Sequence, residues 1–172
     1  MKFRKLYNDE IEGVVEVHRN VVQLLLSKNI RQWMNPIPLN TFQERQKKGE
    51  NFGLFDDEGN FLAYASILIK DNPQEWKASL DGFGARLYWL SSLFSNPLLK
   101  KHKVGTALLE NCFLYLKSIG ADKVILDCVV NEGFLINYYK GFGFSVLDEK
   151  VVKYRSGDFR MALMKKDIKD GK

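Results

Sequence analysis

Three lysines just before a predicted helix could bind phosphate groups. Lys100, Lys101 and Lys103 follow an Asn-Pro pair that ends an apolar, strand-favouring run, and the helix is expected to begin near Gly105. The first N–H groups of a helix have no partner within it, and the helix dipole is positive at that end, so anions are attracted there. The lysines place cations at the same point. We therefore expect the segment Lys100–Lys103, called here the basic turn, to bind a ligand that carries phosphates.

The helix after the basic turn has one apolar face. It is expected to run from about Gly105 to Ile119, and its apolar residues recur at three- and four-residue spacing: Leu108, Leu109, Cys112, Phe113 and Leu116. This periodicity is typical of a helix that packs on a core along one side.

The segment from Asn96 to Leu109 resembles the acyl-CoA loop of the GNAT superfamily of N-acetyltransferases, which usually has the pattern Arg/Gln-x-x-Gly-x-Gly/Ala before a helix. Lys100 stands at the Arg/Gln position, Lys103 at the first glycine and Gly105 at the second. Lys103 is the clearest departure, because glycine adopts positive φ angles more easily than lysine does. The resemblance implies that the pyrophosphate and phosphorylated ribose of CoA bind to Lys100, Lys101, His102, Lys103, Val104, Gly105 and Thr106.

Three further segments resemble the same family. Tyr139–Phe144 fits its Tyr-x-x-x-Gly-Phe pattern, and Asn131 fits, with a one-residue shift, an asparagine that touches the pantetheine arm. Tyr88–Ser95 resembles the family's central splayed strand. The resemblance implies main-chain hydrogen bonds from this strand to the pantetheine amides, with Leu93, Phe94 and Ser95 at the cofactor. A backbone N–H near Leu93 would then polarise the thioester carbonyl, as in an oxyanion hole.

Tyr139 is the candidate general acid. Acyl transfer from a thioester to an amine expels a thiolate, and a phenol beside the sulfur can protonate it. A tyrosine suits this role because its unperturbed pKa of about 10 lies slightly above the value of about 8.5 for a thiol. The alternative is an aromatic side chain in the core, which we expect for the neighbouring Tyr138.

The sequence does not identify the general base. Many family members carry Glu or Asp on the central strand, but residues 86–95 contain no acid. The candidates are Glu44, Asp81, Asp127 and His18. Glu44 has an alternative role in a helix capping box, and Asp127 an alternative role as a buried, hydrogen-bonded acid. An amine of low pKa could instead lose its proton to water.

Trp33 is a candidate for the acceptor pocket. The segment Ile30–Pro36 resembles one that lies between the first two helices in some bacterial members of the family and shapes that pocket. Simple packing of the tryptophan is an equally good interpretation. The two histidines and two cysteines lie far apart and lack the spacing of a zinc site, so no metal is expected.

The other segments complete an α/β fold, a mixed α+β sheet with helices on both faces. Strands are expected at 2–7, 51–55, 61–70, 88–95, 124–130, from 144 and at 159–164, with helices at 9–28, 41–48, 105–119 and 134–140. Asp9 and the capping box Thr41–Glu44 should open the first two helices, and Asp71–Gly84 should be a polar excursion. The order β-α-α-β-β-β-α-β-α-β-β is also the one that a GNAT-like acyl-CoA N-acyltransferase fold implies.

The whole chain is expected to form one domain. Its 172 residues, 45% of them apolar and 13% aromatic, suffice for a core at 1–166, followed by a polar tail at 167–172. The formal charge of +5 comes from scattered residues, so neither nucleic acid nor membrane is expected as a partner. No signal peptide or membrane span is recognisable, and Cys112 and Cys128 should be buried thiols. A cytoplasmic location is therefore expected.

These observations predict an acetyl-CoA-dependent N-acetyltransferase. Acetyl-CoA would be the acyl-donor substrate and an unidentified amine the acceptor, with direct transfer because neither cysteine lies in a nucleophile-like context. The alternative is a noncatalytic acyl-CoA-binding protein of the same fold, suggested by the missing strand acid and by Lys103. A nucleic-acid-binding function is not favoured, because the sequence contains no recognition motif for it. A monomer or a homodimer is expected.

Overall fold

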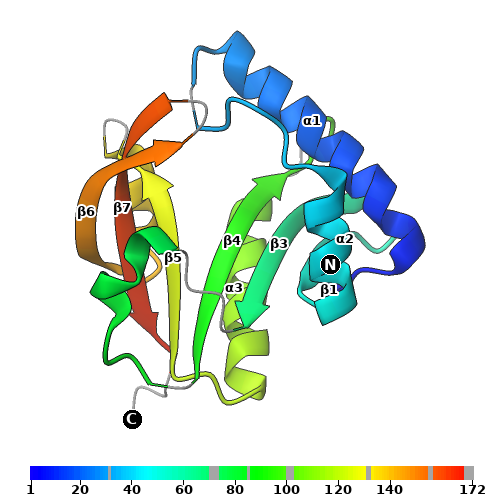
Figure 1. Cartoon of the computed structure of the whole chain (residues 1–172). Helices are drawn as coiled ribbons and strands as arrows, with labels where there is room; N and C mark the ends of the chain where they lie inside the picture. Colours follow the sequence, from blue (N-terminus) through cyan, green and yellow to red (C-terminus); the bar gives the residue numbers. More distant parts are fainter. Residues whose placement is uncertain are drawn as a thin grey trace. The chain divides into compact units, whose positions relative to one another are not determined.

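The computed structural model describes residues 1–30, 32–69, 74–84, 86–99, 103–130, 133–154 and 157–168. Within them the strands are β1 (Lys2–Lys5), β2 (Asn51–Phe55), β3 (Phe61–Ile69), β4 (Leu87–Ser95), β5 (Lys123–Val129), β6 (Ser145–Tyr154) and β7 (Gly157–Asp167). The α-helices are α1 (Ile11–Ser27), α2 (Leu39–Lys48), α3 (Val104–Ser118) and α4 (Phe134–Lys140), with short 3-10 helices η1 (Asn8–Glu10), η2 (Gln74–Trp76) and η3 (Ala78–Leu80). Strands and α-helices follow one another in the predicted order (Figure 1).

The strands form a mixed sheet of seven strands in the order β1-β2-β3-β4-β5-β7-β6. β4 and β5 pair in parallel, whereas β1–β2, β2–β3, β5–β7 and β6–β7 are antiparallel pairs. A parallel pair needs a long crossover connection, and α3 provides it between β4 and β5. The prediction of a mixed α/β sheet is confirmed.

The chain divides into two compact units, which are described separately. The first unit comprises Met1–Ile67 and Ser92–Phe113, and the second comprises Leu68–Ser91 and Leu114–Lys172. β3, β4 and α3 therefore contribute residues to both units.

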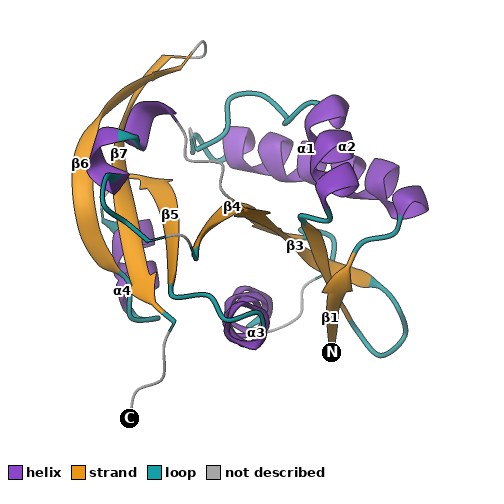
Figure 2. Ribbon diagram, turned by 60° about the horizontal axis from the view of Figure 1, so that its bottom comes forward, coloured by secondary structure: helices purple, strands orange, loops and turns teal. Residues whose placement is uncertain are grey.

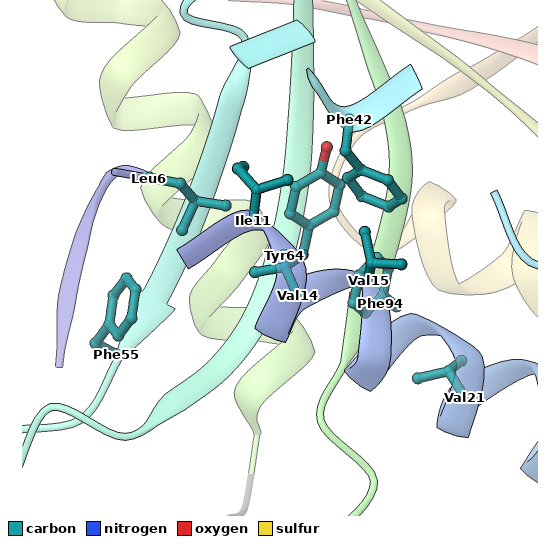
Figure 3. Close-up of a cluster of buried hydrophobic side chains, with 9 residues drawn as sticks. All are labelled: Leu6, Ile11, Val14, Val15, Val21, Phe42, Phe55, Tyr64 and Phe94. Carbon is teal, nitrogen blue, oxygen red and sulfur yellow. The ribbon is translucent and has the colours of Figure 1, made fainter. Parts of the chain in front are cut away.

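The core of the first unit lies between α1, α2 and the strands. α1 buries one face, which consists of Ile11, Val14, Val15, His18, Val21 and Val22. These residues pack with aromatic side chains from α2, β3 and β4, and Figure 3 shows Phe42, Tyr64 and Phe94 gathered beside Val15. α1 and α2 lie on one face of this unit's strands and α3 on the other (Figure 2).

The core of the second unit contains a tryptophan that the sequence did not reveal. Trp76 is fully buried and packs in a cluster with Trp89, Ile125 and Leu163. The predicted polar excursion is therefore wrong for the described part of that segment, because η2 and η3 bury Trp76 and Leu80. A 3-10 turn is too short to show a hydrophobic period, so buried residues within it cannot be recognised from their spacing.

Two predicted helix caps are wrong. Asp9 lies inside η1, and the N–H of Tyr7 donates instead to the carboxylate of Glu10 at 2.7 Å. α2 begins at Leu39, so Thr41 lies in its first turn and donates its N–H to the carbonyl of Pro38 at 3.1 Å. Both helix starts are set by backbone turns, without a side-chain cap at either α-helix.

The sheet extends to Asp167, one residue beyond the expected end of the domain. Ile168 is also part of the fold, since it is 8% exposed and its N–H donates to the carbonyl of Asp122 at 2.9 Å. None of the helices that the structure describes is long and apolar enough to cross a membrane.

His18 is enclosed in the core of the first unit. Its side chain is 0% exposed, and its ring centroid lies 4.9 Å from those of both Trp33 and Phe94. The N–H of Ile37 donates to Nδ1 at 3.4 Å, and none of the described groups pairs with Nε2. Burial, and then the charge of Arg45, lower the pKa of His18 to about 4. His18 is therefore a neutral core residue at pH 7, and its surroundings do not favour the role of general base.

We expect this burial to make the free energy of unfolding fall in acid. The unfolded chain takes up a proton at His18 near pH 6.5 but the folded chain only near pH 4, so the folded state loses stability as the pH drops through this window. The loss attributable to His18 should approach about 3 kcal/mol. Urea unfolding of the wild type and of His18→Gln, measured from pH 7.5 to pH 4, tests this. The variant should be less stable at pH 7.5 but show a flatter pH dependence; an unchanged slope would contradict the assignment.

Candidate active site

The pairing and the backbone conformation of β4 change along its length. It pairs with β5 at Leu87, Tyr88 and Trp89, and the ladder ends there although β5 continues to Val129. Ser92 then has a φ of +56°, in the left-handed region. A left-handed residue within a strand is typical of a bulge, which interrupts regular pairing. The main chain that follows, predicted to bind the pantetheine arm, therefore starts from an irregular point in the strand.

The three β4 residues predicted to contact the cofactor have different surroundings. Phe94 is 6% exposed, and its ring stacks on that of Tyr64 with centroids 4.9 Å apart. Leu93 is half-buried and Ser95 is exposed. Phe94 thus anchors the strand in the core of the first unit, which leaves its main chain rather than its ring for a cofactor.

Lys103 has the left-handed backbone that its position in the family pattern suggested. Its φ is +60°, and its side chain is exposed. Its carbonyl accepts the N–H of Ala107 at 3.0 Å, so it directly precedes the first residue of α3, Val104. The rest of the basic turn, residues 100–102, includes the predicted ligands Lys100, Lys101 and His102 and lies outside the described residues.

The first turn of α3 is held by packing. Val104 is 6% exposed, while Gly105 and Thr106 are half-buried. The helix buries most of its predicted apolar face, with Leu108, Leu109, Cys112 and Leu116 each at most 2% exposed. This packing fixes the direction of the N–H groups at the helix start, which is the geometry that phosphate binding needs.

Tyr139 lies on α4 in the second unit and is 8% exposed. Its ring meets those of Phe144 and Tyr138 edge to face, with centroids 5.9 Å and 5.4 Å away. Burial raises the pKa of Tyr139 well above its usual value, and the neighbouring Cys128 and Asp127 add to the increase. The phenol is therefore protonated at neutral pH, as a general acid must be.

Asp127 lies on β5 in the same unit and is half-buried. The indole N–H of Trp76 donates to its Oδ2 at 3.2 Å. Burial raises the pKa of Asp127, and the hydrogen bond from Trp76 offsets part of that increase. The other acids considered as bases, Glu44 and Asp81, have exposed side chains. A raised pKa makes Asp127 a better proton acceptor than an ordinary carboxylate.

Trp33 is half-buried in the first unit, with its ring 6.2 Å from Phe94 and close to His18. These contacts fit packing, and a role in the acceptor pocket stays a prediction. Asn131 lies outside the described residues. No group of three or more His, Cys, Asp and Glu side chains that could hold a metal ion occurs in the described part of the chain.

Sequence reasoning missed one interaction at β4. The guanidinium of Arg45 on α2 donates to Oγ of Ser92 at 3.0 Å, across 47 residues of sequence. The only sign in the sequence is a pair of serines within an apolar run, which does not identify a partner.

Comparison with known proteins gives the family. The acetyltransferase (GNAT) family matches residues 19–144. The chain belongs to this family. GNAT acetyltransferases use acetyl-CoA as the acyl donor. No curated protein matches the chain.

Solved structures share the GNAT fold across nearly the whole chain. The ribosomal-protein-S18-alanine N-acetyltransferase from Escherichia coli is 16% identical, with a TM-score of 0.72 over 99% of this chain and 96% of that one. A GNAT acetyltransferase from Listeria monocytogenes is 13% identical, with a TM-score of 0.76 over 96% and 94%. The protein yncA from Salmonella typhimurium, solved with its cofactor acetyl-CoA, is 15% identical, with a TM-score of 0.70 over 100% and 96%. At these identities the likeness establishes the fold alone.

Lys103→Gly should leave the stability of this GNAT chain almost unchanged. The substitution relieves strain of about 1 kcal/mol at φ +60° but raises the entropy of the unfolded chain by a similar amount. CoA should bind more weakly, because one cation is lost, and the deficit should shrink at high salt. Calorimetry with CoA at low and high salt measures this.

Lys103→Ala is the matched control for that experiment. It loses the same charge but keeps a Cβ at the left-handed position, so it separates the charge loss from the change in backbone freedom, and its stability should also stay close to that of the wild type. Tighter CoA binding by the glycine variant at every salt concentration would show that Lys103 obstructs the site.

Proposed function

We propose that this protein is an acetyl-CoA-dependent N-acetyltransferase that transfers the acetyl group directly to an amine. The observation that carries the proposal is the buried, protonated Tyr139 on α4 of a GNAT chain, with Asp127 of raised pKa on the adjacent β5. We also propose that the protein acts in the cytoplasm, which its two free and buried thiols support.

Direct transfer is supported by the state of the two cysteines. Cys112 and Cys128 are 0% and 5% exposed. Burial raises the pKa of Cys128 to about 12 and that of Cys112 further still. The reactive form of a cysteine is the thiolate, so neither side chain is a competent nucleophile at neutral pH.

The chemistry follows from the two titratable groups of the second unit. The acceptor nitrogen forms a bond to the acetyl carbonyl carbon, and Asp127 takes the proton that the nitrogen must lose. The carbon–sulfur bond then breaks, and the Tyr139 hydroxyl gives its proton to the departing thiolate. The products are an acetamide and free CoA, and solvent restores both side chains. Lys103 and the first turn of α3 would hold the phosphates, while the main chain of Leu93–Ser95 would hold the pantetheine arm and polarise the carbonyl.

Calorimetry with acetyl-CoA, followed by turnover with a panel of amines, tests the proposal. Peptides with free N-termini, polyamines, aminoglycosides and amino acids are suitable acceptors, and release of free CoA is the readout. Turnover with at least one amine is expected. Tight binding with no turnover by any acceptor would favour the noncatalytic acyl-CoA-binding protein, and absence of binding would overturn both functions.

Tyr139→Phe should lower kcat by about 100-fold and change the affinity for acetyl-CoA by no more than a few-fold. The variant loses the proton donor but keeps the ring that packs on Phe144, so only proton transfer is removed. Tyr138→Phe is the matched control, because it removes a hydroxyl from the adjacent ring, and it should keep wild-type kcat. Equal activity of Tyr139→Phe and wild type would show that Tyr139 has only a packing role.

Asp127→Asn should also lower kcat by about 100-fold at neutral pH, through loss of the base. The amide oxygen can still accept the hydrogen bond from Trp76, so the structure should be retained. The deficit should shrink as pH rises, since more of the acceptor amine is then deprotonated in solution. Asp158→Asn removes an exposed acid from the same unit and serves as the control. A deficit that is constant with pH would argue against general-base catalysis by Asp127.

A further inference from the structure

A left-handed residue in the middle of a strand needs a physical cause. Among the described residues, three that are not glycine have a positive φ, namely Asn29, Ser92 and Lys103. Asn29 lies in the loop after α1 and Lys103 directly before α3, but Ser92 lies within β4. Serine has no intrinsic preference for this conformation, so the surrounding structure must hold it there.

The bond from Arg45 is placed to hold Ser92. Nη1 of Arg45 donates to Oγ of Ser92 at 3.0 Å in a partly buried setting. The donor carries a full charge, which makes the bond stronger than a bond between neutral groups. Arg45 lies in the last turn of α2, where the helix dipole favours a cation.

Arg45 is itself held in place, because the end of α2 is bonded to the strands. The side-chain amide of Gln46 donates to the carbonyl of Leu6 at 2.8 Å. That of Asn51 donates to the carbonyl of Phe42 at 2.8 Å and accepts from the Tyr64 hydroxyl at 2.6 Å. Arg45 therefore reaches β4 from a helix that these hydrogen bonds hold in place. On the far side of Ser92, the Phe94 ring is stacked on that of Tyr64.

We propose that Arg45 is a positioning residue that fixes the left-handed backbone of Ser92, and with it the main chain of Leu93–Ser95. Ser92 is held by Arg45 and Phe94 by the core, so the N–H of Leu93 between them has one direction. This inference rests on the proposed function, in which that main chain receives the pantetheine arm and polarises the thioester carbonyl. Arg45 would act through Ser92 without touching the reacting atoms.

Substitutions at Ser92 separate this role from ordinary packing. Ser92→Ala removes Oγ and keeps a Cβ at φ +56°, so the left-handed backbone loses the restraint from Arg45. Ser92→Gly also removes Oγ, but glycine adopts the left-handed conformation unaided. We expect acetyl-CoA affinity and kcat to fall about tenfold in Ser92→Ala and about threefold or less in Ser92→Gly. Equal losses in the two variants would overturn the proposal.

Substitutions at Arg45 complete the test. Arg45→Met should resemble Ser92→Ala, Arg45→Lys should recover part of the loss, and the double variant Arg45→Met/Ser92→Gly should be no worse than Arg45→Met alone. Lys47→Met removes a cation from the same turn of α2, where its side chain is exposed, and should behave as wild type. If Arg45 were only structural, Arg45→Met would lower Tm but leave acetyl-CoA affinity intact, and its effect would add fully to that of Ser92→Gly.

Amide hydrogen exchange of the free protein makes the inference independent of the proposed function. The amides of Leu93 and Phe94 should exchange at least tenfold faster in Arg45→Met than in Lys47→Met, with a much smaller change elsewhere in the first unit. If these amides exchange faster but the wild type does not bind acetyl-CoA, the proposed function is wrong and the restraint of Ser92 by Arg45 is still supported. Unchanged exchange at both amides would overturn the restraint itself.

Discussion

The hydrogen bond between the Tyr64 hydroxyl and Oδ1 of Asn51 organises the first unit. It is 2.6 Å long, and both side chains are at most 1% exposed. Breaking it would deprive the buried Oδ1 of Asn51 of this donor, and an unsatisfied buried acceptor costs about 1–3 kcal/mol. The side-chain amide of Asn51 connects it to Phe42 and Gln46 of α2, and the Tyr64 ring connects it to Phe94 on β4. Through these contacts Tyr64 fixes both the helix that carries Arg45 and the strand that carries Ser92.

Left-handed backbone occurs directly before two of the α-helices. The residue before α4 is Gly133, with a φ of +72°, and the residue before α3 is Lys103, with a φ of +60°. Glycine is the usual solution for this geometry because it has no Cβ. At Lys103 the chain has a left-handed backbone at a residue that also places a cation next to the proposed phosphate site. The backbone strain is confined to Lys103, whereas its positive charge would act on the ligand.

Burial is the largest cause of each strong pKa shift, and its direction depends on the charge type. It raises the pKa of Tyr139, Cys128 and Asp127, because it disfavours their anions, and lowers that of His18, because it disfavours the cation. The same environment therefore keeps the phenol protonated, the thiols inert and the imidazole neutral. Only Asp127, whose ordinary pKa is low, becomes a better base through burial. Burial of Tyr139 and partial burial of Asp127 are thus conditions for the acid and base roles proposed for the second unit.

The sequence by itself determined the order of the elements, most of their bounds and the family. Helical periodicity gave most of the buried face of α3, and the short motifs at Asn96–Leu109 and Tyr139–Phe144 gave the GNAT pattern, because each depends on residues that are near one another in the chain. It did not determine the caps of α1 and α2, which backbone turns at Tyr7 and Pro38 decide, or the burial of Trp76 in a short turn. The tertiary structure alone decided that Ser92 is left-handed and bonded to Arg45, and that Asp127 is half-buried beside Trp76. These features arise from groups 47 and 51 residues apart, and only the folded chain brings such partners together.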